Sequence, residues 1–141
     1  PTHQVVGFGR ACALAKEEGG ADAIRVGALR EALWRSLAHL PGVSLNSPLA
    51  GGSPAILDVS FEGVEGESLV TALTEIAIST GSACSSATAA GSYVLRSLGR
   101  STELAQSSLR FSLGRFTCAA DIERASEAVK RAFMRLRSVA P

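Results

Sequence analysis

Two long stretches with helical periodicity enclose a middle part of the chain in which the apolar patterns are short and strand-like. Residues 4–40 and 118–139 place apolar side chains at steps of three and four residues, as one face of a helix does. Between them, residues 43–46, 54–61 and 107–113 have patterns typical of short strands. This order predicts an α/β fold, a small two-layer sandwich in which a three- to four-stranded sheet packs with helices.

Glycine and proline mark the breaks between these elements. Pro41-Gly42 ends the first helical stretch. Within that stretch, Gly19-Gly20 is a weak point, because each glycine disfavours a helix by about 1 kcal/mol. The pattern leaves open whether this stretch is one long helix or two. Two shorter helices are expected over residues 67–77 and 92–98.

We expect one domain spanning all 141 residues. It would comprise a long N-terminal helical region (4–40), an α/β part (43–139) and a mobile cysteine loop (80–91). The loop is expected because ten of the eleven residues from 81 to 91 are Gly, Ala, Ser or Thr, and the other is Cys84. None of these side chains is large enough to fix the backbone in a core.

Composition excludes several classes of function. The net charge is +1, and no basic stripe is interleaved with aromatic residues, so we expect no nucleic-acid partner. No apolar run approaches the ~20 residues of a membrane span, and no signal peptide opens the chain, which fits a cytoplasmic protein. Charged residues make up only 19% of the chain. Such a weakly charged surface suggests that another domain or subunit covers part of it.

The cysteines and histidines are too few and too widely spaced for a disulfide framework or a metal site. The chain has three cysteines, Cys12, Cys84 and Cys118, without a Cys-x-x-Cys pair. Its two histidines, His3 and His39, cannot form a His-rich cluster. We therefore expect no metal.

The three cysteines differ in their suitability as nucleophiles, which must reach a partner and form a thiolate. Cys12 lies on the apolar face of the first predicted helix, where a small buried residue is expected. Cys118 follows the expected helix cap Thr117 and lies near Arg115, so the helix dipole and a cation would favour its thiolate. Cys84 has no charged neighbour in sequence, but its loop gives it mobility and access. From the residues alone, Cys84 and Cys118 both stay open.

The sequence around Cys84 resembles a known active-site loop. Residues 79–87, Ser-Thr-Gly-Ser-Ala-Cys-Ser-Ser-Ala, are similar to the loop of group I cysteine desulfurases, which supply sulfur for iron–sulfur clusters and tRNA thiolation. Further motifs resemble the same family in the same order along nearly the whole chain: residues 3–7 (HQVVG), 64–69 (VEGESL), 92–96 (SYVLR) and 105–117 (AQSSLRFSLGRFT).

The resemblance implies the C-terminal small domain of a fold-type I pyridoxal phosphate enzyme of the class V aminotransferase family. It implies that Cys84 accepts sulfur from L-cysteine as a persulfide, with release of L-alanine. Arg110 would bind the substrate carboxylate, because the planar guanidinium grips a carboxylate with two hydrogen bonds. Arg115 is expected to be structural. The residues expected to support the cysteine loop are Gly81, Ser82, Ala83 and Ser85.

The resemblance also implies what the chain lacks. The cofactor lysine of the family belongs to a larger N-terminal domain, and neither Lys16 nor Lys130 lies in a matching motif. We therefore expect no cofactor-binding residue here, pyridoxal phosphate in the full-length enzyme, and an inactive isolated chain. The implied partners are the missing N-terminal cofactor domain, a second copy in a homodimer, and a sulfur-acceptor or iron–sulfur scaffold protein.

Two departures from the family and three alternatives stay open. Ala90-Gly91 stands where many relatives have Glu-Pro, and Cys118 stands where Thr or Ser is expected. The chain would be a fragment of a desulfurase, one chain of a split enzyme or a stand-alone sulfur carrier. The small domain of a related aminotransferase is a further possibility, although the Gly-Ser-Ala-Cys loop argues against it, because a transaminase needs no thiol.

Overall fold

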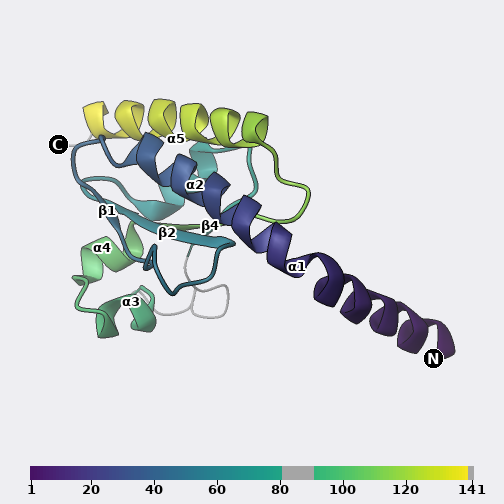
Figure 1. Ribbon diagram of the computed structural model, residues 1–141. Helices are drawn as coiled ribbons and strands as arrows, with labels where there is room; N and C mark the ends of the chain where they lie inside the picture. Colours follow the sequence, from purple (N-terminus) through teal and green to yellow (C-terminus); the bar gives the residue numbers. More distant parts are fainter. Residues whose placement is uncertain (81–90, 140–141) are drawn as a thin grey trace.

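A computed structural model describes residues 1–80 and 91–139 (Figure 1). In this part of the chain, four strands form one antiparallel sheet in the order β1-β2-β4-β3. The predicted α/β class and the three- to four-stranded sheet packed with helices are confirmed. The strands are β1 (Val43–Leu45), β2 (Ile56–Phe61), β3 (Ser79–Thr80) and β4 (Ser108–Ser112).

Helices cover the sheet from two sides. Figure 1 shows α5 above the sheet, with the second half of α1 and α2 on the same side, whereas α3 and α4 lie below it. Among the contacts, α1 and α2 both pack on α5, and α4 packs on β2. The helices are α1 (Thr2–Leu37), α2 (Gly66–Ala72), α3 (Tyr93–Ser97), α4 (Thr102–Gln106) and α5 (Ala119–Val139).

The core lies between the sheet and the helices above it. Side chains alternate along β2, so Leu57, Val59 and Phe61 are fully buried on the side that faces α5. On β4, Leu109 and Phe111 are buried on the same side. From the helices, the fully buried side chains include Leu33, Leu37, Leu69, Val129 and Phe133.

The first helical stretch is one continuous helix of 36 residues, and the Gly19-Gly20 pair does not interrupt it. Its second half is anchored by buried residues, which begin at Val26. Its first half projects from the body of the molecule (Figure 1), and residues 1–12 are all exposed. Phe8 is 74% exposed, because no described part of the chain covers this face.

Short elements differ most from the sequence-based expectation. The helix expected over 67–77 ends at Ala72, and the strand after it has only two residues. The helix α4 was not predicted. It begins after Ser101, whose side chain accepts a hydrogen bond from the amide of Leu104 at 3.2 Å and caps the first turn. Five residues are too short for periodicity to indicate a helix.

Candidate functional site

Most of the predicted site lies outside the described residues. Cys84 and the residues expected to support its loop fall in the segment 81–90, so the structure describes only the residues that flank this segment. Arg110 is described, and it lies in the middle of β4, which pairs with β2 on one side and with β3 on the other. The loop residues outside the described part are Gly81, Ser82, Ala83, Cys84 and Ser85.

Arg110 belongs to a polar face of the sheet, the face opposite the core. In the antiparallel register, Arg110 lies directly opposite Asp58 of β2, and Ser108 lies opposite Ser60. The two serine hydroxyls are 2.7 Å apart. Because residues opposite each other point to the same side of a sheet, these four side chains share one face. We call Asn46, Asp58, Ser60, Ser108 and Arg110 the polar cluster.

Asn46, which follows β1, joins the cluster together. Its side-chain amide donates to Oδ1 of Asp58 at 2.7 Å, to Oγ of Ser60 at 2.8 Å and to Oγ of Ser108 at 3.3 Å. The backbone is fixed at the same place, since the Asn46 amide donates to the Asp58 carbonyl at 2.9 Å. In addition, the Asp58 amide donates to Oγ of Ser47 at 2.6 Å. Asp58 is therefore held through its backbone and its carboxylate.

The polar cluster places a partly buried carboxylate beside cations. Burial raises the pKa of the Asp58 carboxyl above its ordinary value, because desolvation disfavours the charged form. The hydrogen bond from Asn46 and the positive charges of Arg110 and Arg100 act in the opposite direction. Arg100 itself is held in place, since it donates to the carbonyl of Leu45 at 2.5 Å.

The guanidinium of Arg110 has no hydrogen bond and no ion pair with any residue of 1–80 or 91–139. It is half-buried, and Asp58 across the strand is the carboxylate that interacts with it electrostatically. The alternative role of an arginine at such a position is a structural ion pair, which is not formed in the described part. The N–H groups of the Arg110 guanidinium are thus available to bind a carboxylate from outside the chain.

The described residues that flank the segment containing Cys84 lie at the end of β3 and beside α4. Ser79 pairs with Arg110 in the sheet, and Thr80, the next residue, ends β3. The chain re-enters the described part at Gly91, which has a positive φ of 66°. The positive φ favours glycine at this position, and a Cβ atom there would make a tight contact of 3.2 Å with the backbone of Ala105 in α4.

The prediction for Cys12 is wrong. Cys12 is exposed rather than buried, because it lies in the projecting half of α1. The apolar periodicity does correspond to a helix, yet nothing in the described part of the chain packs on that face. The same holds for Val5, which is 67% exposed.

The prediction for the start of the last helix is also corrected. Oγ1 of Thr117 accepts from the amide of Gly114, whereas the carbonyl of Cys118 accepts the first helical hydrogen bond, so Cys118 is the cap residue of α5. Its thiol donates to Oδ2 of Asp121 at 3.1 Å, and its amide donates to the same oxygen at 2.9 Å. The thiol of Cys118 is thus engaged by a carboxylate, and the expected cation Arg115 pairs with Glu18 and Asp22 instead.

Arg115 fixes the segment between β4 and α5 to the long helix. Its guanidinium pairs with Glu18 at 2.5 Å and with Asp22 at 3.0 Å. Arg25 completes the contact by donating to the carbonyls of Arg115 and Thr117. These ion pairs agree with the structural role expected for Arg115.

Both lysines of the chain lie on helices, Lys16 on α1 and Lys130 on α5. Nζ of Lys130 pairs with Glu127 at 3.2 Å, and Lys16 is exposed on the projecting half of α1. Within the described ranges, no group of three or more His, Cys, Asp or Glu side chains is arranged to hold a metal ion. Among the same residues, no helix combines the length and the hydrophobicity that crossing a membrane requires.

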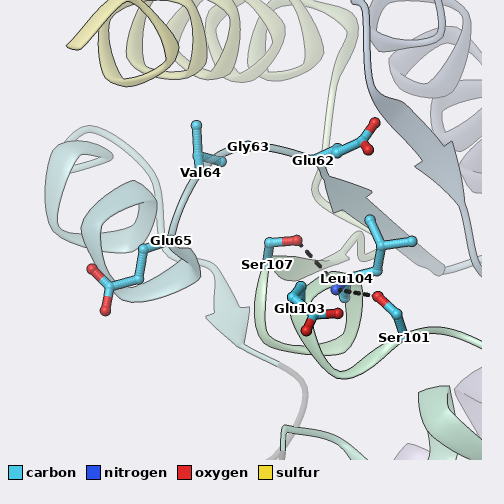
Figure 2. A pocket seen from close by; sticks show the side chains of 8 residues that line it. All are labelled: Glu62, Gly63, Val64, Glu65, Ser101, Glu103, Leu104 and Ser107. Atoms are coloured by element: carbon cyan, nitrogen blue, oxygen red, sulfur yellow. Dashed lines mark hydrogen bonds between the residues drawn. The ribbon is translucent and has the colours of Figure 1, made fainter. Parts of the chain in front are cut away.

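An open pocket of about 570 Å³ lies between the turn after β2 and α4. Figure 2 shows three glutamates around it, Glu62, Glu65 and Glu103, whose carboxylates are spread along the rim and do not converge on one point. Glu65 is partnered, since it accepts from Oγ of Ser68 at 2.6 Å. This pocket has no arrangement of groups that indicates chemistry.

Asn46 and Asp58 are members of the polar cluster that the sequence did not predict. A signal for Asp58 was present: it is the one charged residue in the strand pattern of residues 56–61, at a position where alternation turns its side chain away from the core. The role of Asn46 carries no such signal, because its partners are 12 and 14 residues away along the chain.

Comparison with known proteins agrees with the resemblance noted above. The family model described as aminotransferase class-V matches residues 1–125. The cysteine desulfurases IscS of Edwardsiella ictaluri and Salmonella typhi are each 50% identical to this chain over its full 141 residues. The chain spans 35% of the length of each of these relatives.

Solved structures show the same fold. A NifS-like protein from Rickettsia africae superimposes with a TM-score of 0.78 and 26% identity, covering 91% of this chain and 33% of that one. The cysteine desulfurase CsdA from Escherichia coli gives a TM-score of 0.56 at 26% identity, covering 79% and 25% of the two chains. On the family match and the identity with these relatives, the chain belongs to the aminotransferase class-V family.

Proposed function

We propose that this chain is the part of a cysteine desulfurase that carries the sulfur-accepting cysteine, Cys84, together with Arg110, which binds the carboxylate of the substrate. The observation that carries the proposal is the position of Arg110. Its guanidinium is open within the described residues, and its strand pairs with β3, from which the chain runs on toward Cys84. Cys84 is the fourth residue after Thr80, which is at most about 14 Å of extended chain.

The net reaction is a transfer of one sulfur atom. The thiol of Cys84 and L-cysteine give a persulfide on Cys84 and L-alanine. The bond between Cβ and sulfur of the substrate breaks, a sulfur–sulfur bond forms, and no external oxidant or reductant is needed. Arg110 contributes by holding the substrate carboxylate with two charge-assisted hydrogen bonds, which orients the substrate sulfur toward the thiol.

The cofactor and the partners belong to the whole enzyme. Pyridoxal phosphate, when bound, serves as the electron sink that makes the substrate sulfur labile. It would be held by an N-terminal cofactor domain, because this chain matches only 35% of the length of the Edwardsiella ictaluri cysteine desulfurase. The proposal also includes a cytoplasmic homodimer that passes sulfur to an acceptor or iron–sulfur scaffold protein, by similarity to the cysteine desulfurases.

A hybrid enzyme tests this proposal. In the hybrid, this chain replaces the matching 35% of the Edwardsiella ictaluri cysteine desulfurase. We expect the hybrid to release L-alanine from L-cysteine and to gain one sulfur atom on the peptide that contains Cys84, as measured by mass spectrometry. Cys84→Ser abolishes both signals, whereas the control Cys118→Ser leaves both unchanged. Sulfur on Cys118, with full activity of Cys84→Ser, contradicts the assignment.

The chain alone distinguishes the remaining alternatives. Mixed with the intact Edwardsiella ictaluri enzyme and L-cysteine labelled with radioactive sulfur, the isolated chain takes up label on Cys84 only if it acts as a carrier in trans. Label on the isolated chain, with an inactive hybrid, favours the stand-alone carrier over the desulfurase domain. A hybrid that instead transfers the amino group of L-cysteine indicates a related aminotransferase.

A further inference from the structure

The side chains of Asp58 and Arg110 lie opposite each other on the polar face, yet they do not close an ion pair. Residues directly opposite in an antiparallel pair have Cβ atoms about 4.5–5.5 Å apart, which brings opposite charges within easy reach. No ion pair between the two is present, although Arg110 has no other partner among the described residues. Something therefore holds the Asp58 carboxylate away from the guanidinium.

The hydrogen bonds of Asp58 identify the restraint. Oδ1 accepts from the side-chain amide of Asn46 at 2.7 Å, and Asn46 is itself fixed by Ser60. On the backbone, Asp58 accepts from the amide of Asn46 and donates to Ser47. Arg100, which also acts on Asp58 through its charge, is engaged by the carbonyl of Leu45.

We propose that Asn46 is a positioning residue, which tethers the carboxylate of Asp58 and so keeps the guanidinium of Arg110 open for the substrate carboxylate. This inference rests on the proposed function of Arg110 and adds a residue to it. Without substrate, the tethered Asp58 still balances the charge of the half-buried arginine from across the strand. With substrate, the planar fork of Arg110 is available for two hydrogen bonds to one carboxylate.

The alternative is that Asn46 serves stability alone, by satisfying buried polar groups of the sheet. The two roles predict different behaviour when Asp58 loses its charge. If Asn46 acts by restraining the anion, removal of its amide harms substrate binding only while Asp58 is a carboxylate. If Asn46 instead supports the fold alone, its removal weakens substrate binding whatever residue stands at position 58.

The experiment uses the hybrid enzyme described above and measures kcat and KM for L-cysteine. Asn46→Ala frees the carboxylate to pair with Arg110, so we expect KM to rise about threefold to tenfold with little change in kcat, the effect of one competing ion pair. The double variant Asn46→Ala with Asp58→Asn restores KM to within about twofold of the parent hybrid. Ser112→Ala, an exposed change on the same strand, is the matched control and leaves KM unchanged.

A second variant covers the case in which Asn46→Ala does not fold. Asp58→Glu keeps the charge and lengthens the side chain by one methylene, which brings the carboxylate closer to Arg110 while Asn46 stays in place. We expect this variant to raise KM in the same way. A KM of Asp58→Glu equal to that of the parent hybrid overturns the inference, and so does a raised KM that persists in the double variant.

Failure of the inference and failure of the proposed function are distinguishable. Arg110→Lys keeps the charge but removes the planar fork, so it raises KM if Arg110 binds the carboxylate. If Arg110→Lys raises KM while Asn46→Ala and Asp58→Glu do not, only the role of Asn46 is wrong. If Arg110→Lys leaves KM unchanged, the role of Arg110 itself is wrong.

Discussion

The ring of Phe61 in β2 packs against the ring of Phe133 in α5, with centroids 5.4 Å apart and the planes inclined by 57°. Both side chains are fully buried, so this pair joins the sheet to the helix above it. Tilted aromatic pairs at this distance add to the stability that burial alone provides. The contact between Phe61 and Phe133 therefore helps to fix the position of β2. The polar cluster includes residues of the same strand, so its position depends on this contact as well.

We expect Phe133→Ala to lower the free energy of unfolding by about 3–5 kcal/mol, because it leaves a cavity and removes the ring pair. The matched control is Met134→Ala on the next residue of the same helix. Met134 is 51% exposed, so its truncation is expected to change the free energy of unfolding by no more than about 0.5 kcal/mol. Urea unfolding of the isolated chain measures both, and similar losses for the two variants contradict the packing described here.

Gly66 is the first residue of α2, and we expect that even alanine is not tolerated at this position. A Cβ atom there would lie 2.2 Å from the carbonyl oxygen of Gln106. Glycine to alanine normally stabilises a helix by up to about 1 kcal/mol, but the clash with backbone reverses the sign. Gly66→Ala should therefore destabilise the chain, by about 1–3 kcal/mol.

The control for this prediction is Gly20→Ala in the middle of α1, where a Cβ atom meets nothing within 4 Å. Thermal unfolding followed by circular dichroism should show a lower midpoint for Gly66→Ala and an unchanged or higher midpoint for Gly20→Ala. A higher midpoint for Gly66→Ala means that α2 and α4 do not approach each other as closely as described.

Asp58 should make the chain less stable as the pH rises from about 3.8. Burial raises the pKa of its carboxyl in the folded chain above the ordinary value of 3.8, whereas the unfolded chain keeps a value near the ordinary one. The folded chain therefore binds the proton more strongly, and the stability contributed by Asp58 is lost as the pH rises from about 3.8 through the higher folded value. Asp58→Asn removes this loss.

The measurement is urea unfolding of wild type and Asp58→Asn at a series of pH values. The stability of the variant relative to wild type should rise with pH over that window. Asp22→Asn is the contrasting control, because the hydrogen bond from Arg115 lowers the pKa of the Asp22 carboxyl, so its contribution is lost as the pH falls. If the difference in the free energy of unfolding between Asp58→Asn and wild type does not change with pH, the Asp58 carboxyl is solvated in the folded chain as it is in the unfolded chain.

Strong acid should destabilise the first turn of α5. Hydrogen bonds from the amide and the thiol of Cys118, followed by the bond from Arg124, lower the pKa of the Asp121 carboxyl to about 2. Its contribution to stability is thus present above the unfolded value of 3.8 and is lost as the pH falls through about 2. NMR titration of the carboxyl carbon of Asp121 measures this value directly.

Cys118→Ala keeps the amide donor and removes the thiol donor, so the pKa of the Asp121 carboxyl should move upward, toward but not reaching its ordinary value. Cys12→Ala, on the exposed half of α1, is the matched control and should leave the titration of Asp121 where it was. If the Asp121 carboxyl titrates at its ordinary value in wild type, the cap described at Cys118 is absent in solution.

The sequence predicted what depends on local pattern. The strands over residues 54–61 and 107–113, the long helices at both ends and the place of Arg110 on a strand all follow from periodicity within a few residues. The sequence did not predict features that depend on contacts with distant parts of the chain, such as the burial of a side chain. Cys12 has the pattern of a buried residue but lacks a cover, and Cys118 replaced Thr117 as cap because Thr117 is bonded to Gly114.

The candidate site could be predicted only in part for the same reason. Cys84 and Arg110 were selected from motifs, and their roles stay predictions. Asn46 was out of reach, because its importance arises from β1 and β2 lying side by side, which no stretch of the sequence expresses. Asp58 was within reach, as a carboxylate in an otherwise uncharged strand, had alternation been used to assign each strand residue to a face.

The pairing of β4 with both neighbours limits which insertions and deletions this segment tolerates. Because side chains alternate along a strand, a shift by one residue would exchange its two faces. The side chain of Arg110 would then point into the hydrophobic core around Phe133, and that of Leu109 would point to the polar face. Single-residue insertions within residues 108–112 should therefore abolish folding and carboxylate binding together, whereas the exposed turn at residues 50–51 offers a site where length can change without moving Arg110.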